Sequence, residues 1–256
     1  MKEVHPTAAR GFDIAADAYE RARPGYPDEA VDHVVSSLPP GGRVLDLAAG
    51  TGKFTRSLVA RELDVVAVEP VEGMRARFQE ALPGVGVLAG TAEQIPLPDA
   101  SVDLVVVAQA FHWFDHEPAL AEIARVLGPR GALALIWNVR DERTAWVAHL
   151  TKVIRPHEGA EGRTIPRHRE EAWRAPVEGS ALFRALGSTE FEHGQQMDLA
   201  GLVERVASTS FIAVLPDDAR ARVLDEVRAM PERFEQLRVP RFVFPYVTEV
   251  HAFVRT

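Results

Sequence analysis

The sequence predicts a doubly wound α/β fold, because short apolar runs alternate with helical stretches between residues 40 and 139. The apolar runs are rich in Val, Leu and Ala and are bounded by Gly, Pro or Asp. They span 43–47, 64–69, 85–90, 103–110 and 131–137. The stretches between them repeat apolar side chains at helical spacing, at 51–63, 71–82 and 117–128. Uniformly apolar strands separated by helices are typical of a parallel sheet that is covered on both faces.

The flanking regions differ from this core in texture. Two helices are expected near 8–22 and 28–37, separated by the helix-breaking segment RARPGYP. After residue 140 the pattern predicts further helices, at 142–156, 199–213 and 217–230. It also predicts a strand at 189–197 and one or two strands in 241–256.

We therefore expect one compact domain with three parts. Residues 1–40 form an N-terminal helical cap, 41–140 form the α/β core, and 141–256 supply a helical insertion and the last strands of the sheet. Those strands form an antiparallel edge. The insertion follows the fifth strand, at the sheet edge where open α/β folds bind ligands, so it is expected to act as a substrate lid.

Composition excludes several classes of function. The formal net charge is -8, which argues against non-specific binding to a nucleic-acid backbone. There is no Cys, so disulfides and thiolate metal sites are impossible. No apolar run is long enough to span a bilayer, and the N-terminus has no signal-peptide pattern. We expect a soluble cytoplasmic protein, monomeric or homodimeric, without a metal.

The strongest local motif is VLDLAAGTGKFT, residues 44–55. A strand ends there, a loop of small residues follows, and a helix begins near Gly52, which lets the backbone approach a ligand closely. Gly50 and Gly52 have the spacing of a dinucleotide loop, but Thr55 stands where a third Gly is expected. Asp46, just before the loop, would repel a pyrophosphate and attract an ammonium group. S-adenosylmethionine carries an ammonium and a sulfonium group and no phosphate.

Two further segments belong to the same edge of the predicted sheet. Glu69 ends the second strand, where an acid accepts hydrogen bonds from ribose hydroxyls. The segment GTAEQIPLPDASVDLVVVAQAFHWF places Ala92 and Glu93 after a third strand and delivers Gln109 and an aromatic run after a fourth. A ribose occurs in nicotinamide dinucleotides as well, so Glu69 alone does not identify the cofactor.

Together these motifs carry a family resemblance. The segments LDLAAGTGKFT, VEP, AEQIPLPDASVDLVVVAQAFHWFD and ARVLGPRGALALIW resemble a class I S-adenosylmethionine-dependent methyltransferase. They are most similar to the small-molecule group called type 11, which includes trans-aconitate methyltransferase-like proteins. The resemblance implies a Rossmann-like, mostly parallel seven-stranded sheet and methyl transfer from S-adenosylmethionine, with S-adenosylhomocysteine as product.

The resemblance also implies roles for individual residues. The family usually has Gly where Ala48 stands, so the loop is expected to be slightly tighter here. The residues implied for the cofactor are Asp46, Ala48, Gly50 and Gly52 at the methionine part, Glu69 at the ribose, Pro70, Met74, Ala92 and Glu93 at the adenine, and Gln109 on the methyl-transfer side. Three further residues are implied either to contact the methionine carboxylate or to close the pocket: Tyr19, Arg23 and Tyr26.

Acceptor residues are less specific in the sequence. His112 is either a packed histidine or a general base for the acceptor. Side chains expected to line the acceptor are Phe111, Trp113, Asn138, Arg140 and Trp146. The acceptor is expected to be a small molecule, attacking through O, N or C by in-line displacement. Two alternatives stay open at this point: a nicotinamide-dependent oxidoreductase, and a protein that binds the cofactor without turnover.

Overall fold

The computed structural model describes residues 23–157 and 173–256, and these residues contain a seven-stranded sheet in the order β3-β2-β1-β4-β5-β7-β6. The strands are β1 (Arg43–Leu47), β2 (Asp64–Val68), β3 (Gly86–Leu88), β4 (Val102–Ala108), β5 (Leu127–Arg140), β6 (Phe183–Met197) and β7 (Phe242–Arg255). Strands β1 to β5 pair in parallel, and the C-terminal strands are antiparallel. The predicted doubly wound, Rossmann-like fold is confirmed.

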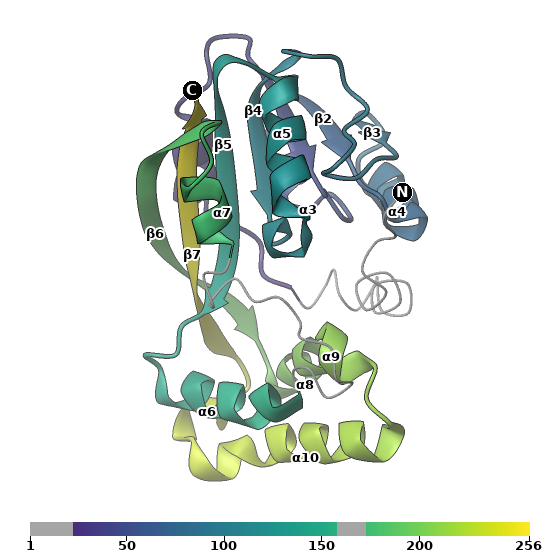
Figure 1. Cartoon of the computed structure of the whole chain (residues 1–256). Helices are drawn as coiled ribbons and strands as arrows, with labels where there is room; N and C mark the ends of the chain where they lie inside the picture. Colours follow the sequence, from purple (N-terminus) through teal and green to yellow (C-terminus); the bar gives the residue numbers. More distant parts are fainter. Residues whose placement is uncertain (1–22, 158–172) are drawn as a thin grey trace. The chain divides into compact units, whose positions relative to one another are not determined.

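Helices alternate with the parallel strands as predicted (Figure 1). They are α2 (Asp28–Val35), α3 (Lys53–Val59), α4 (Glu72–Ala81), α5 (His116–Val126), α6 (Ala145–Ile154), α7 (Arg174–Glu178), α8 (Leu199–Ala207), α9 (Ser210–Ala213) and α10 (Asp217–Arg233). Short 3-10 turns follow at η1 (Phe111–Trp113), η2 (Arg155–His157) and η4 (Glu235–Leu237). The helix expected at 8–22 lies outside the described residues.

The described residues fall into two compact units. The sheet unit comprises 26–138, 173–191 and 248–256, and the helical unit comprises 23–25, 139–157 and 192–247. The chain passes from one unit to the other within strands β5, β6 and β7. The sheet unit contains all of β1 to β4, and therefore every strand that carries the predicted cofactor motifs.

The sheet unit has apolar layers on both faces of its strands. One face carries Val44, Leu104, Val106, Ala134 and Ile136, and helices α2 and α3 pack against it. Alternate positions along β4 and β5 are also completely buried, which requires a cover on the opposite face. Figure 1 shows α5 in front of the strands on that side. This two-sided burial explains the uniformly apolar strands in the sequence.

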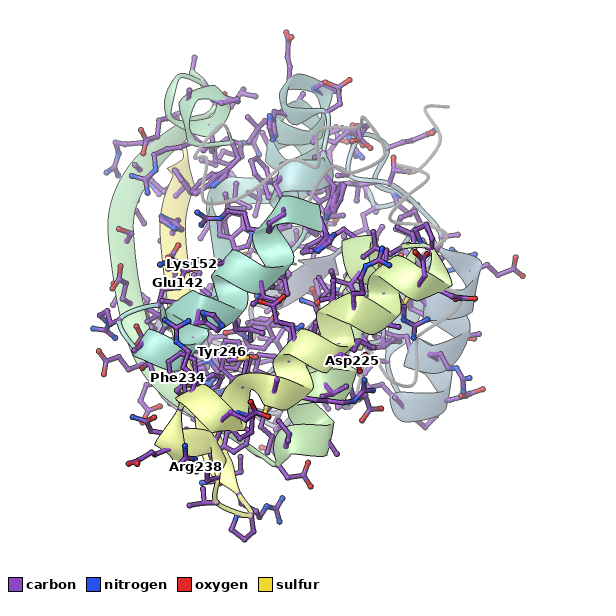
Figure 2. All side chains as sticks on the ribbon, turned by 90° about the horizontal axis from the view of Figure 1, so that it is seen from below. Glu142, Lys152, Asp225, Phe234, Arg238 and Tyr246 are labelled. Carbon is purple, nitrogen blue, oxygen red and sulfur yellow. The ribbon has the colours of Figure 1, made fainter. Side chains whose placement is uncertain are left out.

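The helical unit has a core of its own. Val223, Val227 and Met230 recur at helical spacing along α10, and they are buried in one cluster with Trp146 and Leu150 of α6. Helix α10 contacts α6 and α8. Figure 2 shows α6 and α10 from below, with Tyr246 of β7 between them. No helix in the described ranges is long and apolar enough to cross a bilayer.

Candidate functional site

The loop after β1 adopts left-handed backbone at three of its five positions. The φ angles are 61° at Ala48, 58° at Gly50 and 82° at Gly52. The amides of Ala48 and Ala49 both donate to the carbonyl of Val68 at the end of β2, at 2.8 and 3.1 Å. Left-handed backbone costs an alanine roughly 1–2 kcal/mol, which explains why the family that the sequence resembles uses Gly at position 48.

The two glycines of the loop differ in what surrounds them. A Cβ on Gly52 would lie 2.8–3.0 Å from the side chains of Leu82 and Phe78, so this position needs Gly for packing as well as for φ. A Cβ on Gly50 would meet no atom of the described residues within 4 Å. Gly50 therefore leaves room, within the described part of the chain, for a ligand to approach the backbone closely.

Asp46 is completely buried near the end of β1. Its Oδ2 accepts a hydrogen bond from the Thr55 hydroxyl at 2.5 Å, and its Oδ1 is buried with no hydrogen-bond partner among the described residues. Burial raises the pKa of Asp46 to about 7, and the nearby Glu69 carboxylate also raises it, while the Thr55 hydrogen bond opposes both. A buried acceptor without a donor in the described part of the chain is suited to a donor on a ligand.

Glu69 follows β2 and connects the two strand ends. Its Oε2 accepts from the Gly50 amide and its Oε1 from the Val71 amide, both at 2.9 Å. Burial raises the pKa of Glu69, and these two amides act against the rise. A carboxylate has about four lone-pair directions, so each oxygen keeps one for a ligand hydroxyl. This geometry fits a vicinal diol.

The two carboxylates together define the chemistry of this edge. The register places Asp46 beside Ala67 in parallel strands, so Asp46 and Glu69 share the carboxyl ends of neighbouring strands. Two buried acids near each other are stabilised by a cation and by hydroxyl donors, and they repel a phosphate. A nucleoside with an ammonium group supplies both kinds of donor. The described residues contain no group of three His, Asp or Glu that could hold a metal.

Apolar and backbone groups continue the site past Glu69. Met74 and Ala92 are buried, with 5% and 4% of their surface exposed. Arg75 fixes the turn before α4, because its Nη1 donates to the carbonyls of Glu69 and Pro70 at 2.9 and 2.7 Å. Glu93 Oε1 accepts from the Asp115 amide at 2.9 Å. Pro70 and Glu93 thus lie in anchored segments, Met74 lies in α4, and the contact of the predicted residues with an adenine stays a prediction.

A second strained position follows β4. Gln109 has a φ of 63°, and its amide donates to the carbonyl of Ile136 at 2.8 Å. The turn η1 follows directly and contains His112, whose Nδ1 accepts a hydrogen bond from Trp137 Nε1 at 3.3 Å. In a neutral ring the proton then lies on Nε2. Its role as a base stays a prediction.

Aromatic rings surround His112 in the sheet unit. Trp113 lies 5.1 Å from the His112 ring, between centroids. Phe111 is completely buried and meets Trp173 edge-on at 6.3 Å. Trp173 also contacts Trp137 at 4.6 Å and His251 at 4.9 Å. Phe111 therefore has a packing role in this cluster, and half-buried Trp113 is the better exposed of the predicted acceptor residues here.

The remaining predicted residues are spread over both units. Tyr26 packs edge-on against Phe54 of α3 at 4.9 Å, and Asn138 Oδ1 accepts from Thr248 at 2.6 Å. The helical unit contains Arg23, Arg140 and Trp146, and Trp146 is a core residue with 3% of its surface exposed. Packing accounts for the position of Trp146. Tyr19 lies outside the described residues.

Several residues of the site were not singled out for these roles by the sequence. Thr55 binds Asp46, Arg75 anchors the turn after Glu69, and Trp137 orients His112. Thr55 had a signal, because it stands in the Gly loop where a dinucleotide fingerprint has its third Gly. Arg75 and Trp137 had none, since Arg75 donates to backbone carbonyls and the partner of Trp137 lies in the turn η1, 25 residues away.

Comparisons with known proteins agree with this geometry. Residues 45–135 match a family model described as a methyltransferase domain. The chain is 42% identical over 238 residues to an uncharacterized methyltransferase of Mycobacterium tuberculosis, covering 93% of this chain and 92% of that one. It is 35% identical over 215 residues to an uncharacterized methyltransferase-like protein of Schizosaccharomyces pombe, covering 82% of each. A solved structure from Anaeromyxobacter dehalogenans, described as a type II methyltransferase, aligns with a TM-score of 0.71 at 24% identity and covers 90% of this chain and 97% of that one.

Proposed function

The chain belongs to the methyltransferase family, and from that premise we propose that it transfers the methyl group of S-adenosylmethionine to an O, N or C nucleophile of a small-molecule acceptor by in-line displacement. The observation that carries the choice of methyl donor is the buried Asp46 Oδ1 atom, which has no partner in residues 23–157 and 173–256, beside a Glu69 carboxylate already bound to Gly50. These groups fit an amino-acid-bearing nucleoside.

Each residue of the edge has a definite task in this proposal. Asp46 holds the ammonium group, and ionised Asp46 becomes the favoured form once that cation is present. Glu69 accepts from the two ribose hydroxyls with its remaining lone pairs. Gly50 leaves room for the methionine part, and Met74 and Ala92 offer apolar surface to the adenine.

Catalysis then requires little further chemistry from the chain. When bound, S-adenosylmethionine supplies a methyl group activated by a sulfonium that leaves as a neutral thioether. The residues after β4 position the acceptor and exclude water. Trp137 holds the His112 ring in this region through its indole N–H, so His112 is placed to orient the acceptor.

The kind of acceptor is part of the proposal. A net charge of -8 disfavours nucleic acid, and we regard a small molecule as the partner of a monomeric or homodimeric enzyme. The family comparisons support methyl transfer in general and do not name an acceptor for this chain.

Binding measurements test the choice of cofactor. Isothermal titration calorimetry should show binding of S-adenosylmethionine and S-adenosylhomocysteine and none of NAD(H) or NADP(H). Asp46→Asn and Glu69→Gln should each raise the Kd for S-adenosylhomocysteine about tenfold or more, because each loses charge-assisted hydrogen bonds. Glu72→Gln removes an exposed carboxylate three residues away and should leave the Kd unchanged. Equal affinity in all four proteins would refute the site.

Turnover is tested separately, by following S-adenosylhomocysteine release with candidate acceptors. Release that requires an added small molecule supports transfer, and the methylated product then identifies the atom. Binding without release across oxygen, nitrogen and carbon nucleophiles would favour a cofactor-binding protein instead.

A further inference from the structure

Arg205 of α8 is a buried cation without a carboxylate partner in the helical unit. Only 7% of its surface is exposed, and it takes part in no ion pair with any described residue. A buried charge is costly unless it is paired and hydrogen-bonded. The arginine therefore lacks the counter-charge that its environment demands.

The hydrogen bonds of this guanidinium do not replace a counter-charge. Its Nε donates to Tyr246 Oη at 3.3 Å and its Nη1 to Thr209 Oγ1 at 3.4 Å. Both acceptors are neutral, and both distances are longer than the usual range for an N–H···O bond. A guanidinium has five N–H donors, so most of them have no partner here.

The Nη2 end of Arg205 has no partner among the described residues, because the printed hydrogen bonds use Nε and Nη1. The residue keeps 7% of its surface exposed, so it is not completely closed off by the described part of the chain. In the proposal below, the ligand approaches through this exposed part.

The surroundings hold the guanidinium in place. Tyr246, with 1% of its surface exposed, stacks against His193 at 5.6 Å with an interplanar angle of 27°. On β7 itself, Phe244 lies 4.6 Å from the Tyr246 ring. Figure 2 shows Tyr246 between α6 and α10, within this packed layer. A donor fixed by such packing is preorganised for an acceptor.

The carbonyl groups at the end of α8 offset the charge of Arg205 only in part. Arg205 is in the last turn of this helix, where unpaired carbonyls carry about half a negative charge. The Arg205 carbonyl itself already accepts from the Ser208 hydroxyl at 2.9 Å. Helix carbonyls therefore offset part of the charge, and they also make the place unfavourable for an anion with two negative charges.

We propose that Arg205 binds the carboxylate of a small organic acid. One planar guanidinium matches one carboxylate through two parallel N–H···O bonds. Phosphate, with two charges and more acceptor atoms, is the poorer match beside helix carbonyls. The site gives the helical unit a ligand-binding role of its own, which does not depend on methyl transfer in the sheet unit.

The experiment measures binding of defined acids to the full chain. Acetate, benzoate and succinate are titrated at constant ionic strength and followed by nuclear magnetic resonance, with acetamide, benzamide and succinamide as uncharged controls and inorganic phosphate as a second anion. The indole signal of Trp146 is a suitable reporter, because its ring lies 5.0 Å from Phe244. At least one acid should bind ten times more tightly than its amide.

Variants assign the binding to Arg205. Arg205→Met keeps the aliphatic stem and should weaken the acid about tenfold or more. Arg205→Lys keeps the charge but loses the planar fork, so it should bind more weakly than wild type and also decides the matter if Arg205→Met does not fold. Arg222→Met, an exposed arginine of α10 paired with Asp218, is the matched control and should change nothing.

Three results would overturn the proposal: no acid binding better than its amide, wild-type affinity in both Arg205 variants, or phosphate binding more tightly than every acid. Titration of S-adenosylhomocysteine into each protein separates this outcome from the proposed function. If the Arg205 variants lose acid binding and retain S-adenosylhomocysteine binding, the result supports the Arg205 site. If acid binding is present and S-adenosylhomocysteine binding is absent, the result counts against the cofactor site alone.

Discussion

At the scale of single residues, Asp46 makes cofactor binding depend on pH. Burial raises its pKa to about 7 in the ligand-free chain. An ammonium group binds the ionised carboxylate, and the ionised fraction grows as pH rises through 7. We expect the Kd for S-adenosylhomocysteine to fall about tenfold between pH 6 and pH 8, with release of a proton on binding.

Calorimetry in buffers of different ionisation enthalpy measures that proton directly. The side chain in Asp46→Asn cannot ionise. The Kd of this variant for S-adenosylhomocysteine should therefore be higher than that of wild type, and it should lack the change with pH that Asp46 causes between pH 6 and pH 8. The same tenfold change in Asp46→Asn as in wild type would place the titrating group elsewhere.

Substitution by Ala should have different consequences at the two glycines of the loop. Gly50→Ala adds a methyl group where no described residue lies within 4 Å, at a cost of about 1 kcal/mol for its positive φ, and it should weaken the binding of S-adenosylhomocysteine. Gly52→Ala meets Phe78 and Leu82 at 2.8–3.0 Å, and it should lower the free energy of unfolding by about 2–3 kcal/mol. Urea unfolding and calorimetry on both variants separate the effects. A greater loss of stability in Gly50→Ala would contradict this assignment.

Whether the sequence identified a residue depends on how far along the chain its partners lie. Asp46, Glu69 and the loop glycines follow strands that are adjacent in chain order, so their position could be predicted from local pattern. The acceptor for Trp137 Nε1 lies 25 residues away, and the partner of Arg205 on β7 lies 41 residues away. Such contacts depend on packing between distant elements, which single-sequence patterns do not encode.

At the scale of elements, Arg125 of α5 fastens the segment that follows Ala92 and Glu93. Its Nη1 donates to the Leu97 carbonyl at 2.8 Å and its Nη2 to the Ile95 carbonyl at 2.9 Å. Glu122 joins the same network, because it binds Arg125 and accepts from the Ile95 amide at 2.9 Å. One side chain thus holds a whole loop on its helix.

Arg125→Lys keeps the charge but cannot donate in several directions at once. We expect the free energy of unfolding to fall by about 2 kcal/mol, and hydrogen exchange at the Ile95 amide to become faster. Arg77→Lys on α4, where the arginine forms a surface ion pair with Glu80, should change neither. Unchanged exchange at Ile95 would show that the loop does not need this anchor.

The limits of elements show what local pattern misses. Strand β5 begins at Leu127 and continues to Arg140, although Gly128 and Pro129 predicted a break before residue 131. Val102 of the neighbouring strand β4 pairs with Leu127, and Leu104 pairs with Ala132. The register shift between these two pairs accommodates the turn residues of β5. Helix α3 is shorter than its apolar pattern, ending at Val59. Tertiary pairing decides these boundaries.

At the scale of the whole molecule, the raised pKa of Asp46 opposes folding at neutral pH. The folded chain binds this proton up to about pH 7, whereas the unfolded chain releases it near pH 3.8. The contribution of Asp46 to the free energy of unfolding is therefore complete below about pH 4, and it is lost as pH rises toward 7. The raised pKa of Glu69 acts in the same direction.

Other carboxylates act in the opposite direction. Arg143 lowers the pKa of Asp141, and Arg125 lowers that of Glu122, so their contributions are lost as pH falls through the acid range. The absolute stability curve mixes both kinds of group. Only the difference between wild type and an Asp46 variant isolates the buried acid.

That difference should grow with pH. The free energies of unfolding of Asp46→Asn and wild type should differ by a constant amount below pH 4. Between pH 4 and pH 8 the variant should become more stable relative to wild type by up to about 4 kcal/mol, because the pKa of Asp46 is about 7 in the folded chain and 3.8 in the unfolded chain. Urea unfolding followed by tryptophan fluorescence measures this. A Trp146→Phe background confines the signal to the sheet unit, because the other three of the four tryptophans lie there. Saturating S-adenosylhomocysteine should stabilise the wild-type protein more than the Asp46→Asn variant at pH 8, since its ammonium group pairs with the ionised acid. A pH-independent difference would mean that Asp46 stays charged in the folded chain, and the predicted pH dependence of S-adenosylhomocysteine binding would then be wrong.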